Sequence, residues 1–190
     1  MYCADRDVAD LILLHQHSNQ GALRAKWGKD QNLLMLRFFY FQAIFALVLS
    51  LPFALILVNQ TPGLNYFEIA GACLCLVAIV GESTADYQLK SFKKDRSNAG
   101  KICMRGLWYY SRHPNYFFEW LVWVGYFIMA LGSPLGYLSI ICPVVMYYIL
   151  TQVTGIGYTE ASMLKSRGEA FAEYQKTTSS FFPWPKRAGI

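Results

Sequence analysis

Two pairs of polar residues beside apolar sequence are the strongest candidates for chemistry in this chain. Glu82 and Asp86 stand four residues apart at the end of one apolar run, and Asn115 and Glu119 stand four apart near the start of the next. Residues four apart share one face of a helix. An ionisable side chain at membrane depth costs about 2.5–3.5 kcal/mol, so it is expected to face a bundle interior or a wet cavity. The pairs are therefore predicted to converge in one sheltered cavity, although capping at the membrane surface would also explain Asp86.

A basic segment separates the two pairs in the sequence. Its cations are Lys90, Lys93, Lys94, Arg96, Lys101, Arg105 and Arg112. Arg112 and His113 immediately precede Pro114, which suits the first turn of a helix because a proline there leaves no N–H without a partner. The free N–H groups at such a helix start favour an anion. The anion would be either the phosphates of a nucleotide cofactor or the headgroups of anionic lipids, and spacing alone does not separate the two.

Four apolar stretches must position these residues. They run from about Leu33 to Val58, Tyr66 to Gly81, Tyr116 to Leu131 and Leu135 to Ile156. A membrane-spanning helix needs about 20 mostly apolar residues, with a range of roughly 17–25. The second and third stretches reach that length only when their polar ends are included. Charged residues make up only 15% of the chain, against roughly 25% in soluble domains, so a soluble bundle with apolar core helices is the weaker interpretation.

The placement of Lys and Arg predicts the topology. They fall in three segments, up to Arg37, from Lys90 to Arg112 and after Tyr158, while the connectors 59–65 and 132–134 contain none. Four crossings would put the three basic segments on one side, which the positive-inside rule identifies as cytoplasmic. The sequence thus predicts an integral, multi-pass, all-α transmembrane bundle of about four membrane-spanning helices. Both termini would be cytoplasmic, with membrane lipids rather than nucleic acid as partners of the net charge of +5.

The ends of the chain complete this prediction. Residues 1–32 are expected to form an N-terminal surface segment, and residues 33–190 a membrane-embedded domain. After the fourth stretch we expect a C-terminal interfacial helix and a tail whose Phe181, Phe182 and Trp184 belong to an interfacial aromatic belt. No CxxC occurs and the histidines lack cysteine or carboxylate partners at ligand spacing, so no metal site is predicted.

Three ordered segments carry a family resemblance. They are GESTADYQLKSFK at 81–93, GLWYYSRHPNYFFEW at 106–120 and EYQKTTSSFFPWPK at 173–186. Together they resemble the DUF1295 family, grouped with the steroid 5-alpha-reductase C-terminal domain in the isoprenylcysteine carboxyl methyltransferase-like superfamily. The resemblance covers about Leu64 to Lys186, and more loosely Trp27 onward. RHPNY alone is not specific, because isoprenylcysteine carboxyl methyltransferases and related phospholipid methyltransferases carry a similar segment.

The resemblance implies a membrane oxidoreductase of lipid metabolism that uses NADPH to reduce a carbon–carbon double bond of a lipid or steroid-like enone. The residues that would bind the cofactor are Asp86, Lys90, Lys93, Arg112, His113, Asn115 and Glu119. The residues that would act on the substrate are Tyr110, Tyr116 and Glu119. Phe118 departs from the family pattern, because it stands where a glycine is usual and a cofactor would approach the backbone closely.

A second departure concerns the substrate carbonyl. Steroid reductases polarise it with a Gln-Glu pair on N-terminal helices, and this chain begins too late to contain them. The resemblance leaves that role to Tyr110 or Tyr116.

Two alternative functions stay open at this point. One is an S-adenosylmethionine-dependent methyltransferase of the isoprenylcysteine type, in which Glu160 would contact the cofactor. The other is a truncated, non-catalytic membrane protein.

Overall fold

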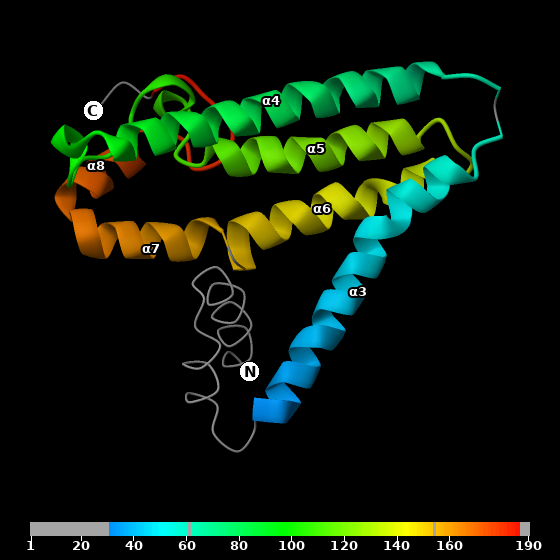
Figure 1. Ribbon diagram of the computed structural model, residues 1–190, viewed down its shortest axis with the longest axis horizontal. Coiled ribbons are helices and arrows are strands. Elements are labelled where there is room, and N and C mark those ends of the chain that lie inside the picture. Colours follow the sequence, from blue (N-terminus) through cyan, green and yellow to red (C-terminus); the bar gives the residue numbers. More distant parts are fainter. Residues whose placement is uncertain (1–30, 61, 154, 187–190) are drawn as a thin grey trace. The chain divides into compact units, whose positions relative to one another are not determined.

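The computed structural model describes residues 31–60, 62–153 and 155–186 (Figure 1). The structure is all-helical, with 77% helix and no strand among the described residues. The chain divides into two compact units, residues 1–51 and residues 52–190. The predicted surface segment 1–32 lies almost wholly outside the described residues. Helix α3, Gln31–Leu57, accounts for the first apolar stretch and continues through Pro52.

Helix α4, Tyr66–Lys94, is longer than its apolar stretch. It begins at a capping box in which Asn65 accepts the N–H of Glu68 and the Glu68 side chain accepts the N–H of Asn65. The apolar run ends near Gly81, but the helix continues for more than three further turns because Glu82–Lys94 contains neither proline nor glycine. The polar residues therefore extend the second stretch, as expected, but the helix ends at Lys94 and thus continues beyond Asp86.

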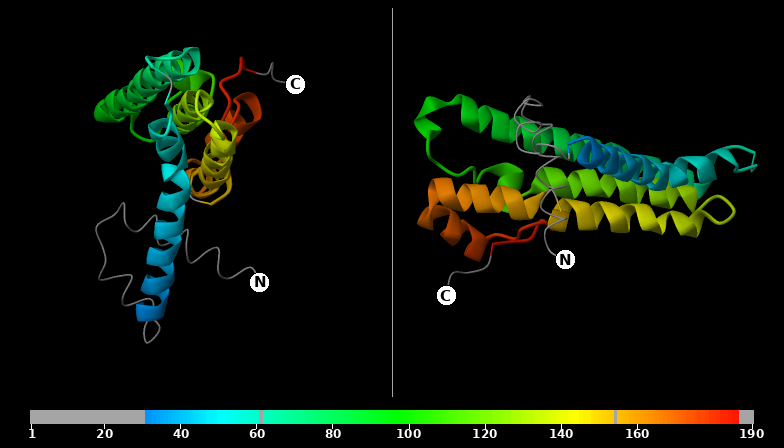
Figure 2. Two further views of the ribbon diagram at one scale, coloured as in Figure 1. Left: turned by 90° about the vertical axis from the view of Figure 1, so that its right-hand side faces the viewer. Right: turned by 90° about the horizontal axis from the view of Figure 1, so that it is seen from below.

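Helix α5, Pro114–Ala130, packs antiparallel along α4 (Figures 1 and 2). Small residues let the two backbones approach, as is common between membrane helices. A Cβ on Gly71 would lie 2.5 Å from the Gly125 carbonyl oxygen, and a Cβ on Gly81 would overlap the Phe118 ring. Phe118, which departs from the family pattern, thus fills the space that a glycine on the facing helix leaves open.

The fourth apolar stretch is not one regular helix. A 3-10 turn, Gly136–Ile140, leads into α6, Ile141–Tyr148, which ends in a π-helical segment, Ile149–Val153. Helices α7, Ile156–Arg167, and α8, Glu169–Thr177, follow. The indole of Trp120 donates to the Pro143 carbonyl oxygen at 2.9 Å and joins α5 to α6.

The C-terminal tail folds back onto the bundle. The Phe181 ring contacts those of Phe117, Trp120 and Tyr147 at centroid distances of 5.2–5.9 Å. The side chain of Phe181 is buried, whereas Phe182 and Trp184 remain exposed. The prediction of an interfacial belt is therefore wrong for Phe181, because the tail turns this ring into the core and leaves its two neighbours outside.

Within the described part of the chain, three helical segments are long and apolar enough to cross a membrane, namely Asn32–Leu57, Tyr66–Lys94 and Gly136–Arg167. Helix α5 has 17 residues, which is at the lower end of the spanning range of roughly 17–25. Many apolar side chains on α4 and α6 are exposed, which is expected of helices that face lipid. The predicted class, an all-α transmembrane bundle, is confirmed.

Candidate functional site

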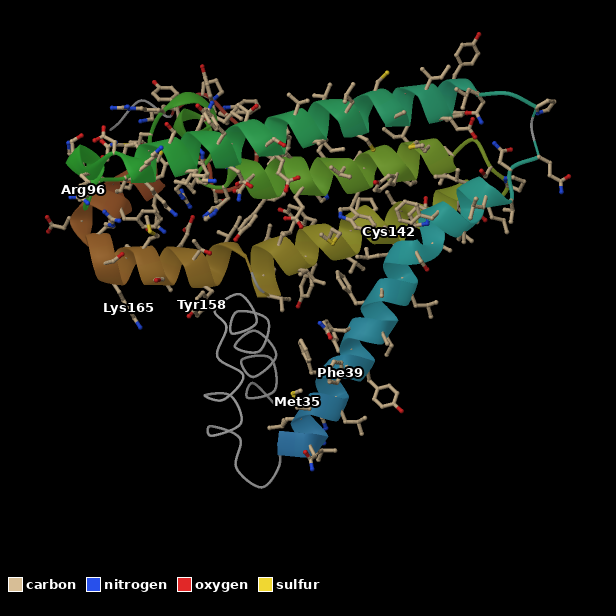
Figure 3. All side chains as sticks on the ribbon, viewed as in Figure 1. Met35, Phe39, Arg96, Cys142, Tyr158 and Lys165 are labelled. Atoms are coloured by element: carbon tan, nitrogen blue, oxygen red, sulfur yellow. The ribbon has the colours of Figure 1, made fainter. Side chains whose placement is uncertain are left out.

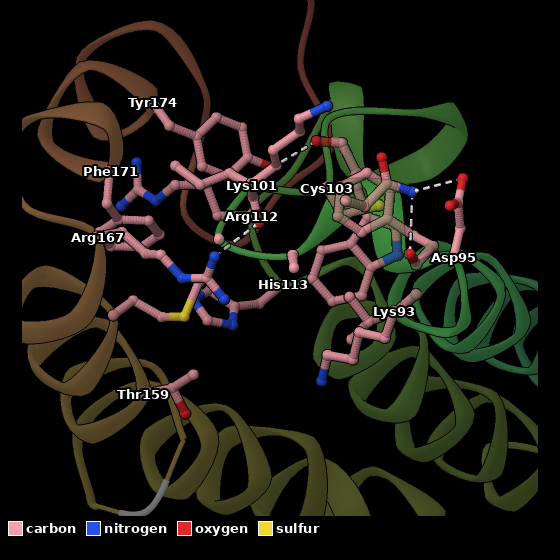
Figure 4. A pocket seen from close by; sticks show the side chains of 18 of the residues that line it. Lys93, Asp95, Lys101, Cys103, Arg112, His113, Thr159, Arg167, Phe171 and Tyr174 are labelled. Carbon is pink, nitrogen blue, oxygen red and sulfur yellow. Dashed lines mark hydrogen bonds between the residues drawn. The ribbon is translucent and has the colours of Figure 1, made fainter.

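A cavity of about 660 Å³ lies at the end of the bundle where α4 ends and α5 begins (Figure 4). It collects side chains from both helices, from the loop that joins them, and from α7 and α8. Its lining residues are Leu89, Phe92, Lys93, Asp95, Arg96, Asn98, Ala99, Gly100, Lys101, Ile102, Cys103, Trp108, Arg112, His113, Asn115, Tyr116, Thr159, Met163, Arg167, Phe171 and Tyr174. The volume falls within the range of about 300–1,000 Å³ that is typical of ligand sites.

The loop after α4 is held in place by its own hydrogen bonds. Asp95 caps a short 3-10 turn, Arg96–Asn98, by accepting the N–H of Ser97 at 2.9 Å. Hydrogen bonds from Ser97, with Arg105 and Lys101 nearby, lower the pKa of Asp95, so this carboxylate stays charged at neutral pH. The Asn98 amide donates to the Phe92 carbonyl oxygen at 3.0 Å. These contacts fix the backbone of the cavity rim.

A buried ionic network forms the wall opposite that loop. The Arg112 guanidinium donates to both Glu160 oxygens, at 2.7 and 3.1 Å, which is the bidentate geometry of a strong pair. His113 Nε2 lies 3.1 Å from Glu160 Oε1, and the Gln175 amide donates to Oε2 at 2.6 Å. Arg112 also donates to the Gln175 and Thr178 carbonyl oxygens. One carboxylate on α7 thus ties the start of α5 to the end of α8.

Tyr174 secures the same wall from α8. Its hydroxyl donates to the Trp108 carbonyl oxygen at 2.5 Å and also lies 3.3 Å from the Ser111 carbonyl oxygen. The hydroxyl is buried, and burial raises its pKa above the ordinary value for tyrosine. The phenol therefore remains a donor well into alkaline solution. Trp108 in turn donates its indole N–H to the Ala85 carbonyl oxygen at 2.9 Å, which connects the wall to α4.

Replacing Tyr174 by phenylalanine is expected to destabilise the fold by about 1–3 kcal/mol, since buried carbonyl oxygens lose their donor. The measurement is thermal unfolding of the purified protein in detergent. Tyr148→Phe is the matched control, because Tyr148 is exposed on α6 and its replacement should change stability little. Equal effects of the two substitutions would contradict the role assigned to the Tyr174 hydroxyl.

The cavity is strongly cationic. Five basic side chains line it, and Asp95 is the one carboxylate among the described lining residues; the cations are Lys93, Arg96, Lys101, Arg112 and Arg167. Glu160 neutralises Arg112, which leaves four cations to face the cavity. Arg167 donates to the Lys101 carbonyl oxygen at 3.1 Å, so α7 and the loop meet at this point. Lys93 and Arg167 enter from α4 and α7 respectively (Figure 4). Such a lining attracts an anion.

The inner end of the cavity is formed by the first turn of α5. Asn115 lines it, and the buried Oδ1 of Asn115 has no hydrogen-bond partner among the described residues. Tyr116 lines it as well, with its ring stacked on His113 at a centroid distance of 5.4 Å. An open acceptor and a phenol therefore lie together where the cavity enters the bundle. A ligand amide is one group that would satisfy Asn115.

The structure brings together five of the predicted site residues, namely Lys93, Arg112, His113, Asn115 and Tyr116, and it places the other four elsewhere. Asp86 and Lys90 are exposed on α4. Glu119 is partly buried and interacts electrostatically with Glu82 and Asp86. The acidic residues thus lie near one another but outside the described cavity lining, and their assignment to the site stays a prediction.

Tyr110 also lies apart from the cavity lining that the structure describes. It is exposed, its ring contacts Tyr109, and its carbonyl oxygen accepts the N–H of Trp184 at 3.0 Å. Residues that the sequence did not single out line the cavity instead. They are mainly Met163, Arg167, Phe171 and Tyr174, from α7 and α8. The sequence indicated them only as part of the expected C-terminal interfacial helix.

The fold and the cavity define a helical membrane protein with a cationic, aromatic-walled site at one end of its bundle. The family model for DUF1295, described as a protein of unknown function, matches residues 18–178. The chain therefore belongs to the DUF1295 family. No curated protein and no solved structure matches it.

Proposed function

We propose that this protein is an integral membrane oxidoreductase that uses NADPH to reduce a carbon–carbon double bond of a lipid or steroid-like enone. The observation that carries the proposal is the surplus of cations around a cofactor-sized cavity. NADPH carries several negative charges on its phosphates. Four lining cations besides Arg112, opposed only by the Asp95 carboxylate among the described lining residues, provide the complementary charge. The resemblance of the three sequence segments to the steroid 5-alpha-reductase C-terminal domain supports the same reaction type.

The cavity residues divide naturally between the parts of such a cofactor. Lys93, Lys101 and Arg167 would hold phosphates, since each brings a cation to the lining. Asn115 would accept a hydrogen bond from the carboxamide at the inner end, where its Oδ1 is unpartnered. When bound, NADPH supplies the hydride for the reduction. Tyr116 would donate a hydrogen bond to the substrate carbonyl oxygen and polarise the double bond.

The methyltransferase alternative is less well supported by the geometry. S-adenosylmethionine carries a positive sulfonium centre, which a cationic lining repels. Glu160, its expected contact, already accepts hydrogen bonds from Arg112 and Gln175 and lies within hydrogen-bond distance of His113. The buried network thus accounts for Glu160 without a bound ligand.

Both termini are expected in the cytoplasm, because four crossings would put the three basic segments on one side of the membrane.

A double substitution tests the phosphate site. Lys93→Ala with Lys101→Ala is expected to weaken NADPH binding at least about tenfold, because each lost cation removes part of the charge match, and tenfold corresponds to about 1.4 kcal/mol. Binding is measured by thermal shift and by fluorescence titration of the detergent-solubilised protein. The matched control is Lys90→Ala with Lys94→Ala, which removes two neighbouring lysines that do not line the cavity.

The outcome separates the three functions. Binding that is lost in the first variant and kept in the second supports the NADPH site. A thermal shift with S-adenosylmethionine and none with NADPH would move the assignment to the methyltransferase class. A folded protein that responds to neither cofactor would indicate a non-catalytic membrane protein.

A further inference from the structure

Exposed tyrosines mark two levels along α4. Tyr66 stands at the first position of the helix and is 91% exposed, and Tyr87 is 72% exposed near its polar end. At 1.5 Å per residue the two lie about 31 Å apart along the axis. The hydrocarbon core of a bilayer is about 30 Å thick, and tyrosine and tryptophan are enriched at its two surfaces. The spacing matches a bilayer that covers the segment between them.

The fourth stretch also carries an exposed tyrosine near each end. They are Tyr137, after the turn at Gly132, and Tyr158 in α7. Tyr137 belongs to the end of the bundle where α4 begins, because Gly132 packs against the Asn65 side chain. Tyr158 lies along the α7 segment that leads toward the cavity (Figure 3). Tyr147 and Tyr148 are exposed between them as well, and the stretch is not one regular helix. The agreement with α4 therefore rests on the ends of the bundle at which Tyr137 and Tyr158 lie, not on their separation.

Charges flank the second level. No Lys or Arg occurs in the segments 66–87 and 137–158 or in α5, while Lys90 follows Tyr87 and Lys165 follows Tyr158. In Figure 3, Lys165 and Arg96 lie beyond Tyr158 toward the end that holds the cavity. Lysines just outside an apolar segment extend into the headgroup layer. The change from tyrosine to cation is typical of a membrane boundary, and the acidic Glu82 and Asp86 lie just to its apolar side on α4.

The tail contributes further aromatic groups of the interfacial type. Tyr109, Tyr110 and Trp184 are exposed, and the Trp184 N–H donates to the Tyr110 carbonyl oxygen at 3.0 Å. The ammonium of Lys186 lies 4.6 Å from the centre of the Tyr109 ring. The turn that bears these tyrosines is joined to α4 through Trp108 and Ala85, two residues before Tyr87. This aromatic group therefore lies close to the level of Tyr87.

The cavity lies almost entirely beyond that level. Its lining residues on α4 begin at Leu89, after Tyr87, and those on α7 begin at Thr159, after Tyr158. The exception is the first turn of α5. Phe118 packs on Gly81, so these two residues lie at the same level of the antiparallel helices. Tyr116 precedes Phe118 by two residues and is therefore level with a point on α4 about 6 Å before Tyr87, on its apolar side. The cavity approaches the apolar layer through this one turn.

We propose that the bilayer boundary crosses the bundle at Tyr87 and Tyr158, so that the cavity occupies the headgroup and water layers and meets the hydrocarbon only at Tyr116. Resting on the proposed function, this position defines the substrate class. The substrate is a lipid whose reactive double bond lies beside its polar head. A double bond in the middle of an acyl chain would lie too deep to reach Tyr116.

Spin-label depth measurements test the boundary without any reference to activity. A keto amino acid coupled to a nitroxide would replace Tyr87, Tyr158, Val77 or Lys94 in turn, which leaves the native cysteines in place. All four positions are exposed. In nanodiscs, the ratio of oxygen to nickel-chelate accessibility should be several-fold higher at Val77 than at Tyr87 and Tyr158, and lowest at Lys94. Ratios at Tyr87 and Tyr158 equal to that at Val77 would overturn the boundary.

Photo-crosslinking tests the substrate class. Two phosphatidylcholine probes carry a diazirine either next to the glycerol ester or at the end of the acyl chain. The first probe should label the start of α5 around Tyr116, and the second only the middle of α4 around Val77. Equal labelling of the Tyr116 region by the chain-end probe would overturn the inference. If the protein did not bind NADPH while the spin-label depths were as expected, the proposed function would be wrong and the membrane boundary would still hold.

Discussion

Replacing Glu160 by alanine is expected to destabilise the protein by about 3–5 kcal/mol, because it leaves the Arg112 guanidinium buried without its carboxylate. For a chain of this size, that loss corresponds to a decrease of about 6–20 °C in the apparent melting temperature. Thermal unfolding in detergent measures it. The Arg112 side chain is only 9% exposed, so water cannot replace the lost partner at low cost.

The expected size reflects how many groups depend on Glu160. Its two oxygens accept from Arg112 and Gln175, and one also lies 3.1 Å from His113. Their loss uncouples α7 from the segment that begins α5. Glu160→Gln should be milder than Glu160→Ala, since the amide oxygen keeps one acceptor in place. The cavity would lose part of its wall in both variants.

Glu173→Ala provides the control for Glu160. Glu173 pairs with Lys176 at 3.3 Å, but both side chains are largely exposed. Exposed pairs contribute about 0–1 kcal/mol, so this variant should unfold close to the wild-type temperature. If the two alanine variants unfolded at the same temperature, the buried network would not be the feature that holds α7 in place.

The sequence predicted the helices well, because the hydropathy of a stretch indicates whether its helix faces lipid or water. The same signal misplaced the end of α4. Hydropathy falls at Glu82, whereas the backbone remains helical to Lys94 since nothing in that segment breaks a helix. The loop after α4 was predicted as a basic connection, and the structure shows a hydrogen-bonded rim built on Asp95 and Asn98.

Only the site residues that lie within one short segment of the sequence could be predicted. Arg112, His113 and Asn115 were found because their segment combines cations with a helix start. Helical spacing placed Asn115 and Glu119 on one face, yet Asn115 lines the cavity and Glu119 does not. The cavity wall depends on how α7 and α8 return to the start of α5, which is a contact between residues about 50–70 positions apart. Spacing within one helix carries no information on such contacts.

The packing of α4 on α5 leads to a second large effect. Gly71→Ala is expected to destabilise the bundle by about 1–3 kcal/mol through overpacking. The new Cβ would lie 2.5 Å from the Gly125 carbonyl oxygen and 2.7 Å from the Met129 backbone nitrogen. Backbone atoms cannot rotate away as a side chain can, so the two helices must separate. Thermal unfolding in detergent again gives the measurement.

Gly157→Ala is the matched control for Gly71→Ala, because both glycines lie in helices and a Cβ on Gly157 meets no atom within 4 Å. Alanine is a better helix former than glycine by about 1 kcal/mol, so this variant should be as stable as the wild type or more so. Gly71→Ala has the same propensity gain, so the difference in stability between the two variants measures the steric conflict alone. Because α4 and α5 also carry Lys93 and Asn115 to the cavity, separation of the helices should weaken NADPH binding in Gly71→Ala and leave it unchanged in Gly157→Ala. A stabilised Gly71→Ala variant would mean that the two backbones do not meet at this point.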